Sequence, residues 1–301
     1  MRNKFTKDGS YITACPTGPD SGWMAMSMDE VAAKEIDQTA FMSWARPMLT
    51  PRFMKMFRTV FAGELPDGSM IFVGDNGHCL TVTPAGQTID EFVSPGTDSP
   101  KNTGHLRSAT VIGGRVIAVG MQRQVYVRDE RGQWSELRAG LPRYGEGGTA
   151  GFEAVAAVAA DEVYAAGWDG EIWRFDGNAW HRMDSPTNRI ITALCVDRAT
   201  GTVHGCGRSG LLLSGRGDAW DVHPDLRCPD DLWSLAVQGK QLFAAGLNRL
   251  YCVEDNAISL VDFGALDATT FGGLVQNKGQ LWSIGEKDVV AYDGSTWSRI
   301  A

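Results

Sequence analysis

A module of about forty residues recurs along most of this 301-residue chain, and it limits the fold more than any other sequence feature. Each module contains an apolar run that ends in glycine. These glycines are Gly74, Gly120, Gly167, Gly207, Gly246 and Gly285, and successive ones lie 46, 47, 40, 39 and 39 residues apart. Such modules form a repeat structure, because one module cannot bury its own apolar faces and needs its neighbours to cover them.

A large side chain marks the same place in five of these modules. Trp134, Trp180, Trp220 and Trp297 follow their glycines by 14, 13, 13 and 12 residues, and Ile258 takes this place in another module. Two markers that stay in step along the chain indicate one repeated structural unit.

Each module holds four short β-like runs separated by turn residues. In the third module the runs are 154–158, 163–166, 171–175 and 180–183, with turns at Asp161, 168–170 and 176–178. No module has room for an amphipathic helix, which excludes a helix-containing α/β repeat. Four short strands at this period are typical of a propeller blade, so we predict an all-β propeller of four-stranded blades. We expect the glycine at the end of the second strand, where the backbone turns tightly.

Six blades can be read from the sequence, at about 57–97, 104–142, 150–186, 188–226, 230–265 and 269–301. The first 56 residues are irregular. We predict strands at 10–16 and 22–27, and a capping box at 27–30 that opens a short helix through about Ile36. Residues 41–57 are ambiguous between helix and strand. The segment is either a seventh blade with a helical insertion, or a cap on a six-bladed ring whose N-terminal strand helps to close the circle; both give a single domain.

The end of the last module resembles a known turn. Residues 292–297 read YDGSTW, which resembles the aspartate-box turn of sialidase-type propellers, and 175–180 (FDGNAW) and 216–220 (RGDAW) are degraded versions of it. The pattern over 57–301 is similar to bacterial propellers of the aspartate-box and photosystem-assembly-factor kind. WD40 repeats are a poorer match, since no Gly-His opening or Trp-Asp ending recurs. The resemblance implies a fold and carries no chemistry.

Composition argues against several classes of function. A net charge of −8 opposes a general role in nucleic-acid binding and fits solubility or a basic partner. The six cysteines show no C-x-x-C pair, which predicts reduced thiols and no zinc site. Residues 1–10 do not resemble a signal peptide, and no apolar run approaches the ~18 residues of a membrane span. We therefore expect a cytoplasmic protein that does not insert into a membrane.

Catalytic and cofactor signatures are missing from the sequence. The five histidines fall at different positions in their blades, and no G-x-S-x-G, H-E-x-x-H or phosphate-binding loop occurs. We therefore expect no cofactor, no bound metal and no enzymatic activity.

Basic and aromatic residues recur on one expected face. In a propeller, the loops between second and third strands share a face with the connections between blades. The connections would place Lys101, Arg143 and Arg227 on that face, in addition to the candidate residues named at the end of this paragraph. Arg and Trp are enriched at interface hot spots, so we predict a partner-binding surface that attracts anions or an acidic partner. Its candidate residues are Arg123, Tyr144, Trp168, Asp169, Arg189, Arg208, Arg249 and Lys287.

Three functions follow as hypotheses. The leading one is a protein-binding scaffold, in its concrete form a bacterial immunity protein that blocks the active site of a cognate toxin. The second is a glycan-acting enzyme or a lectin that binds an anionic small molecule. A sialidase-like enzyme would need three arginines and a tyrosine nucleophile, for which Tyr144 is available, but no Tyr–Glu pairing stands out.

The third hypothesis is an accessory assembly factor of a larger complex. It would dock through the apolar side chains of the N-terminal segment, unless these simply pack on the ring. These side chains are Trp23, Met24, Met26, Phe41, Met42 and Trp44.

Overall fold

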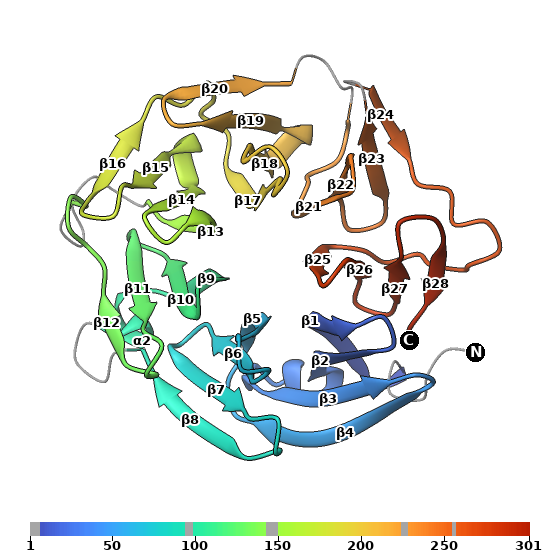
Figure 1. Ribbon diagram of the computed structural model, residues 1–301. Helices are drawn as coiled ribbons and strands as arrows, with labels where there is room; N and C mark the ends of the chain where they lie inside the picture. The colour runs from blue at the N-terminus through green and yellow to red at the C-terminus, as the bar shows by residue number, and fades with distance from the viewer. Residues whose placement is uncertain (1–6, 94–98, 143–149, 224–227, 255–256) are drawn as a thin grey trace.

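Seven four-stranded antiparallel sheets stand around a central axis and form a seven-bladed propeller (Figure 1). This computed structural model describes residues 7–93, 99–142, 150–223, 228–254 and 257–301. The predicted all-β propeller is confirmed, and the ring has seven blades. Each sheet pairs four strands that are consecutive in the chain, so blade 1 consists of β1 to β4 and blade 7 of β25 to β28.

The first two strands of each blade lie nearest the axis (Figure 1). The innermost strands are β1 (Gly9–Gly18), β5 (Thr59–Glu64), β9 (Leu106–Ile112), β13 (Phe152–Ala159), β17 (Ile191–Val196), β21 (Ser234–Gln238) and β25 (Gly273–Asn277). The second strands are β2 (Ser21–Met28), β6 (Met70–Gly74), β10 (Arg115–Gly120), β14 (Glu162–Gly167), β18 (Val203–Gly207), β22 (Gln241–Ala245) and β26 (Gln280–Ile284).

The other two strands of each blade lie toward the rim. The third strands are β3 (Thr39–Ala45), β7 (His78–Val82), β11 (Gln124–Arg128), β15 (Ile172–Phe175), β19 (Leu212–Arg216), β23 (Leu250–Glu254) and β27 (Val289–Tyr292). The outermost strands are β4 (Met48–Lys55), β8 (Thr88–Phe92), β12 (Trp134–Glu136), β16 (Trp180–Met183), β20 (Ala219–Val222), β24 (Ala257–Leu260) and β28 (Trp297–Arg299). Short helical turns are α1 (Asp29–Ala32), α2 (Pro100–Thr103), η2 (Trp168–Gly170) and η3 (Arg208–Gly210).

The aspartate-box turn joins the two outer strands, as the resemblance implied. The Oδ1 atom of Asp293 accepts hydrogen bonds from the backbone N–H groups of Ser295 and Thr296, both at 2.8 Å. These bonds hold the pKa of the Asp293 carboxyl well below its usual range. Asp176 makes the same turn in blade 4, where it accepts from Asn178 and Ala179 at 2.8 and 2.9 Å. The aspartate thus satisfies backbone donors that the tight turn leaves without strand partners.

The repeated glycines end or directly follow the second strands, but for a reason other than the predicted tight turn. The backbone at Gly207 is extended, with a φ of −173°, which any residue can adopt. Close approach explains the glycine, because a Cβ on Gly207 would lie 2.0 Å from the carbonyl oxygen of Ile190. The same holds for Gly167 and Gly285, where an added Cβ would lie 2.1 and 2.0 Å from a backbone carbonyl oxygen. The incoming connection therefore presses directly on the glycine.

The N-terminal segment forms blade 1, which supports the seventh-blade interpretation over the cap. Its ambiguous part, 41–57, lies mostly in β3 and β4. The helical insertion is shorter than expected, because α1 contains four residues and Met28, rather than Ser27, precedes it without a side-chain cap. The capping box is therefore wrong. The Asp29 carboxylate instead accepts hydrogen bonds from Ser10 at 2.8 Å and from Lys287 at 2.6 Å.

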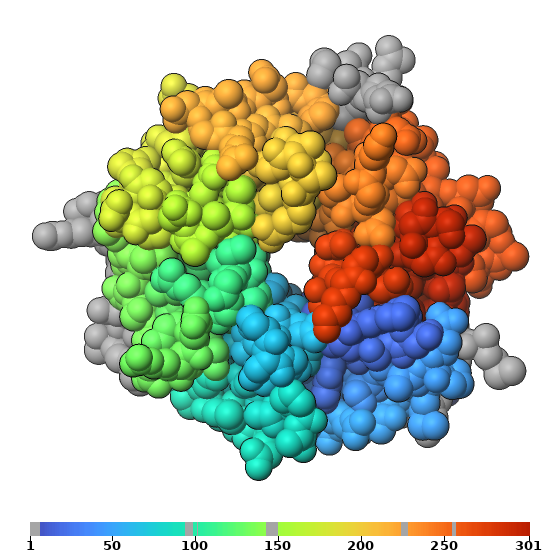
Figure 2. Space-filling view, in the orientation of Figure 1, coloured from blue at the N-terminus to red at the C-terminus, as the bar shows by residue number. Residues whose placement is uncertain are grey.

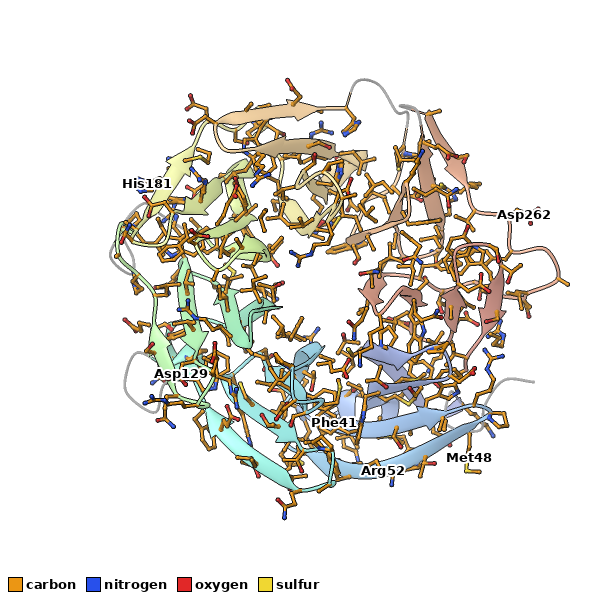
Figure 3. The ribbon with its side chains drawn as sticks, in the orientation of Figure 1. Phe41, Met48, Arg52, Asp129, His181 and Asp262 are labelled. Carbon is orange, nitrogen blue, oxygen red and sulfur yellow. The ribbon has the colours of Figure 1, made fainter. Side chains whose placement is uncertain are left out.

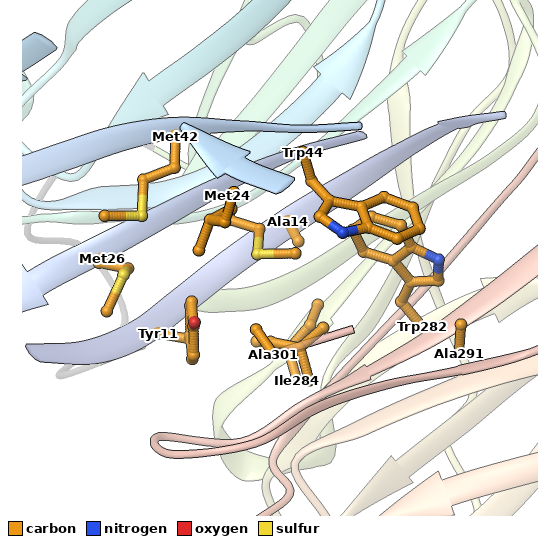
Figure 4. Packing of buried hydrophobic residues seen from close by; sticks show 12 residues of the cluster. Tyr11, Ala14, Met24, Met26, Met42, Trp44, Trp282, Ile284, Ala291 and Ala301 are labelled. Carbon is orange, nitrogen blue, oxygen red and sulfur yellow. The ribbon is translucent and has the colours of Figure 1, made fainter. Parts of the chain in front are cut away.

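Blade 1 closes the ring against blade 7 by side-chain packing (Figure 4). Trp44 meets the edge of Trp282 with 5.3 Å between ring centroids, and both indoles are buried. The Tyr11 N–H donates to the Glu286 carbonyl oxygen at 3.0 Å, which ties the two blades together by their backbones. Aromatic pairs of this geometry stabilise by about 0.5–1.5 kcal/mol beyond the area they bury.

Five of the six apolar N-terminal side chains that the third hypothesis required for docking are buried in the ring, and the sixth, Trp23, is half-buried against Phe53 and Phe72. Met24, Met26 and Phe41 are fully buried, and Met42 and Trp44 are buried almost as completely. In Figure 3, Phe41 points into the blade, whereas Met48 and Arg52 lie on the rim. The alternative that this segment covers its neighbours is confirmed.

The close approach at Gly207, which the repeated glycine Gly246 does not share, predicts a contrast between two alanine variants. Gly207→Ala should lower the free energy of unfolding by about 1–3 kcal/mol, because the connection at Ile190 must move away. Gly246→Ala is the matched control, since its Cβ would meet nothing closer than 3.4 Å. Urea unfolding followed by tryptophan fluorescence measures both. Equal stability of the two variants would contradict this explanation of the glycines.

Candidate functional site

The connection face is the face that carries the connections between blades and the loops between second and third strands. The opposite face carries the two remaining hairpin turns of each blade, and we call it the hairpin face. Of the eight predicted partner-binding residues, seven lie on the connection face. Tyr144 falls outside the described residues, as do Arg143 and Arg227, two further expected contributors.

Carboxylates accompany four of the cations that were predicted on this face. Arg123 pairs with Glu171, and Lys287 pairs with Asp29. In the same way, Arg208 and Arg249 pair with two neighbouring aspartates, Asp231 and Asp230. The face therefore presents ion pairs, and its local positive potential is weaker than a count of cations suggested.

Arg123 is a structural residue that joins blade 3 to blade 4. Its Nε and Nη2 atoms donate to the two carboxylate oxygens of Glu171 at 2.7 and 2.6 Å, and both side chains are less than a tenth exposed. Burial disfavours the charged form of Glu171, yet the hydrogen bonds from Arg123 and from the Trp173 indole outweigh it and lower the pKa of this carboxyl. A partner could not reach this guanidinium without breaking a buried pair.

Trp168, Asp169 and Arg189 lie on the neighbouring loops of blades 4 and 5. The Trp168 indole donates to Glu153 at 2.7 Å, whereas Asp169 is exposed and sits at a positive φ of 56°. Arg189 reaches across to the loop of blade 5, where its Nη1 donates to the carbonyl oxygen of Ser209 at 3.0 Å. These loops are thus fixed by bonds to adjacent segments.

A groove of about 460 Å³ opens between blades 5 and 6, and two predicted residues, Arg208 and Arg249, lie on its walls. The Arg208 guanidinium lies over the ring of Trp233, 4.5 Å from the ring centroid. Its Nη1 donates to Asp231 at 2.5 Å, and the same carboxylate accepts from the backbone N–H of Ser209 at 2.8 Å. The bonds from Ser209 and Arg208 lower the pKa of Asp231.

The other wall of the groove comes from blade 6. Leu247 is 57% exposed there, beside Arg249. The Nη1 atom of Arg249 donates to Asp230 at 3.2 Å, and the Tyr251 hydroxyl donates to the same carboxylate at 2.6 Å. Burial and this hydrogen bond raise the pKa of the Tyr251 hydroxyl. The groove therefore combines two held guanidinium groups with an indole and an exposed aliphatic side chain.

Trp233 connects the groove to the central channel. The channel has a volume of about 400 Å³ and is lined mainly by the innermost strands (Figure 2). Trp233 lines both spaces. A segment bound in the groove would therefore lie at the mouth of the channel.

Sequence reasoning missed Asp230, Asp231, Trp233 and Leu247. The run 228–233 reads CPDDLW and lies in a connection, so its acidic pair and its tryptophan were visible signals. The prediction used basic and aromatic residues of the loops between second and third strands and of the connections. It took no account of acidic partners, because cross-blade pairing depends on a geometry that spacing does not reveal.

The histidines divide between three that each pair with an aspartate and one cluster. Two of them, His204 and His223, both contact the Ser214 hydroxyl at 2.7 Å. Burial and the neighbouring His223 lower the pKa of His204.

All six cysteines are free thiols. In the described ranges, no group of three or more His, Cys, Asp or Glu side chains could hold a metal ion. Among the same residues, no helix is long and apolar enough to cross a membrane.

The different surroundings of two predicted site residues lead to different expected stabilities. Arg123→Ala should lower the free energy of unfolding by about 3–5 kcal/mol, because it leaves the buried Glu171 carboxylate without its main partner. Arg249→Ala should leave the free energy of unfolding nearly unchanged, since its pair with Asp230 is solvent-exposed. Chemical denaturation of both variants measures the difference, and equally small losses would show that Arg123 is not structural.

Solved structures share the fold at low sequence identity. The chain is similar to YCF48 bound to a D1 peptide, with 14% identity and a TM-score of 0.69 over 97% of this chain and 93% of that one. YCF48 from Cyanidioschyzon merolae is 14% identical, with a TM-score of 0.71 over 94% of this chain and 95% of that one. A virginiamycin B lyase from Staphylococcus aureus is 11% identical, with a TM-score of 0.65 over 97% of this chain and 96% of that one. The resemblance to assembly-factor propellers is confirmed at the level of the fold.

Sequence comparison adds a nearer relative. No model of a known protein family matches the chain. It is, however, 36% identical over 236 residues to the immune protein Tsi7 of Pseudomonas aeruginosa, which covers 78% of this chain and 76% of that protein. Identity of this extent, across most of both chains, shows common descent. The chain belongs to the family of the immune protein Tsi7.

Proposed function

We propose that this protein is the immunity partner of a bacterial toxin, which it neutralises by covering the toxin's active site with loops of the connection face. The observation that carries the proposal is the 36% identity to the immune protein Tsi7 over most of both chains. A propeller suits this task physically, because its closed ring fixes the loops and so lowers the entropy that binding costs.

We infer that the protein acts by binding and carries out no reaction of its own. The arginines that an enzyme acting on a carboxylate would need are spread over different blade contacts. Arg123 is buried against Glu171 between blades 3 and 4, whereas Arg208 and Arg249 line the groove between blades 5 and 6. The six free thiols fit a reducing compartment, so we place the protein in the cytoplasm.

The proposed toxin-binding surface is centred on the groove and on the loops beside it. Arg208 and Arg249 line the groove, and Arg189 contacts the adjoining loop at Ser209. Trp168 and Asp169 occupy the equivalent loop of blade 4. Tyr144 and Lys287 complete the candidate set, and Arg123 supports it from within the ring.

The experiment purifies candidate toxins encoded near the gene and titrates each with the full chain. We expect tight binding with one-to-one loss of toxin activity, and survival of cells that express both proteins. Arg189→Glu on the connection face should weaken binding at least tenfold by reversing a charge in the interface. Arg131→Glu is the matched control, because Arg131 is exposed in a turn of the hairpin face.

Two outcomes would contradict the proposal. Absence of binding and of protection would refute the immunity function itself. A loss of affinity in Arg131→Glu as large as that in Arg189→Glu would refute the connection face as the binding surface.

A further inference from the structure

Arg208 is held ready to bind an anionic group at the groove. Its guanidinium is stacked on Trp233 and bonded to Asp231, and Asp231 is in turn fixed by the backbone N–H of Ser209. A side chain that is already ordered loses little rotamer entropy on binding. A guanidinium carries five N–H donors, and the hydrogen bond to Asp231 runs through Nη1 alone. The group therefore has donors beyond those that the aspartate accepts.

In each ion pair of the groove, the carboxylate is less exposed than the arginine that pairs with it. Asp230 is 28% exposed and accepts from both Arg249 and Tyr251, while Arg249 is 51% exposed. In the second pair, Asp231 is 37% exposed and Arg208 is 44% exposed. A bound segment therefore meets guanidinium groups on both walls, with each carboxylate serving as the local counter-charge.

Apolar surface lies between these charges. Leu247 is 57% exposed on one wall, and the Trp233 ring forms part of the other. Burial of an exposed leucine side chain favours binding, and Trp and Arg are among the residues most enriched at interface hot spots. An apolar side chain placed between Leu247 and Trp233 would put its flanking residue beside Arg208.

We propose that this groove binds a toxin loop in which a single Asp or Glu stands next to an apolar side chain. The apolar side chain contacts Leu247 and Trp233, and the carboxylate accepts hydrogen bonds from Arg208 and Arg249. The net charge of −8 favours a partner that is basic overall, so the acidic residue is one local feature of that partner. This inference rests on the proposed immunity function and names the chemistry that its binding surface recognises.

The test pans a phage-displayed library of random peptides against the full chain, and it does not require the toxin to be identified first. We expect enrichment of peptides that carry Asp or Glu within two positions of Leu, Ile, Phe or Met. Affinity of a selected synthetic peptide should fall at least tenfold in Arg208→Gln and in Leu247→Ser. Loss of a charge-assisted hydrogen bond accounts for the effect of Arg208→Gln, and loss of apolar contact accounts for the effect of Leu247→Ser.

The control variant is Arg216→Gln, which should bind the selected peptides unchanged. Arg216 resembles Arg208 in being half-exposed and paired with a carboxylate, Glu162, but it lies on the hairpin face. Thermal unfolding of each variant checks that the ring stays folded. Failure to enrich any peptide, enrichment of basic peptides, or equal binding to wild type and Arg208→Gln would overturn the proposal.

A competition step separates this inference from the proposed function. The purified toxin should displace the selected peptides from the full chain. If the toxin binds and the peptides stay bound, the groove is not its docking site, although the immunity function stands. If the toxin does not bind at all, the proposed function fails.

Discussion

The contact between blade 1 and blade 7 is the constraint on which the rest of this structure depends. Each sheet is one continuous stretch of chain, so the strand ladders join no blade to another. The ring is closed by packing, chiefly by Trp44 against Trp282, with the bond from Tyr11 to Glu286 beside it. A sheet of four short strands covers its two faces only with neighbouring blades. Without this seam the two end blades would each expose an apolar face to water.

Closure also fixes the geometry of the groove. Gly207 lets the connection before blade 5 approach to van der Waals distance, and η3 begins directly after it. The next connection then returns across the same loop, where Asp231 binds both Ser209 and Arg208. The groove walls thus come from the loop of blade 5, the connection, and the loop of blade 6. Their relative positions follow from the packing of two blades in a closed ring.

The sequence was sufficient for the repeat and for six of the blades, because glycine and tryptophan recur at fixed positions. Blade 1 was harder to read, since its second and third strands are joined by an insertion that contains α1, and it lacks the apolar run ending in glycine. At the site, the position of Arg208 and Arg249 on one face was predictable from loop topology. Their partners Asp230 and Asp231 were not, because both lie in the connection between blades 5 and 6, where Asp231 pairs back to the loop of blade 5 and Asp230 pairs forward to the loop of blade 6.

The prediction for Arg123 shows a further limit. Arg123 and Arg208 both lie in loops between a second and a third strand, yet Arg123 is buried and Arg208 is nearly half exposed. The difference depends on Glu171, whose carboxylate lies in the next blade. Spacing along the chain tells which loop carries a cation. It does not tell what the adjacent blade presents to it.

The most direct measurement of the central claim is amide hydrogen exchange of the full chain, alone and in complex with its cognate toxin. The account predicts that the toxin slows exchange in the loops of the connection face, at 208–210, 229–233 and 246–249. It predicts unchanged exchange in the hairpin-face turns at 129–133, 176–179 and 293–296. Protection confined to those turns, with the groove loops exchanging as in the free protein, would contradict it.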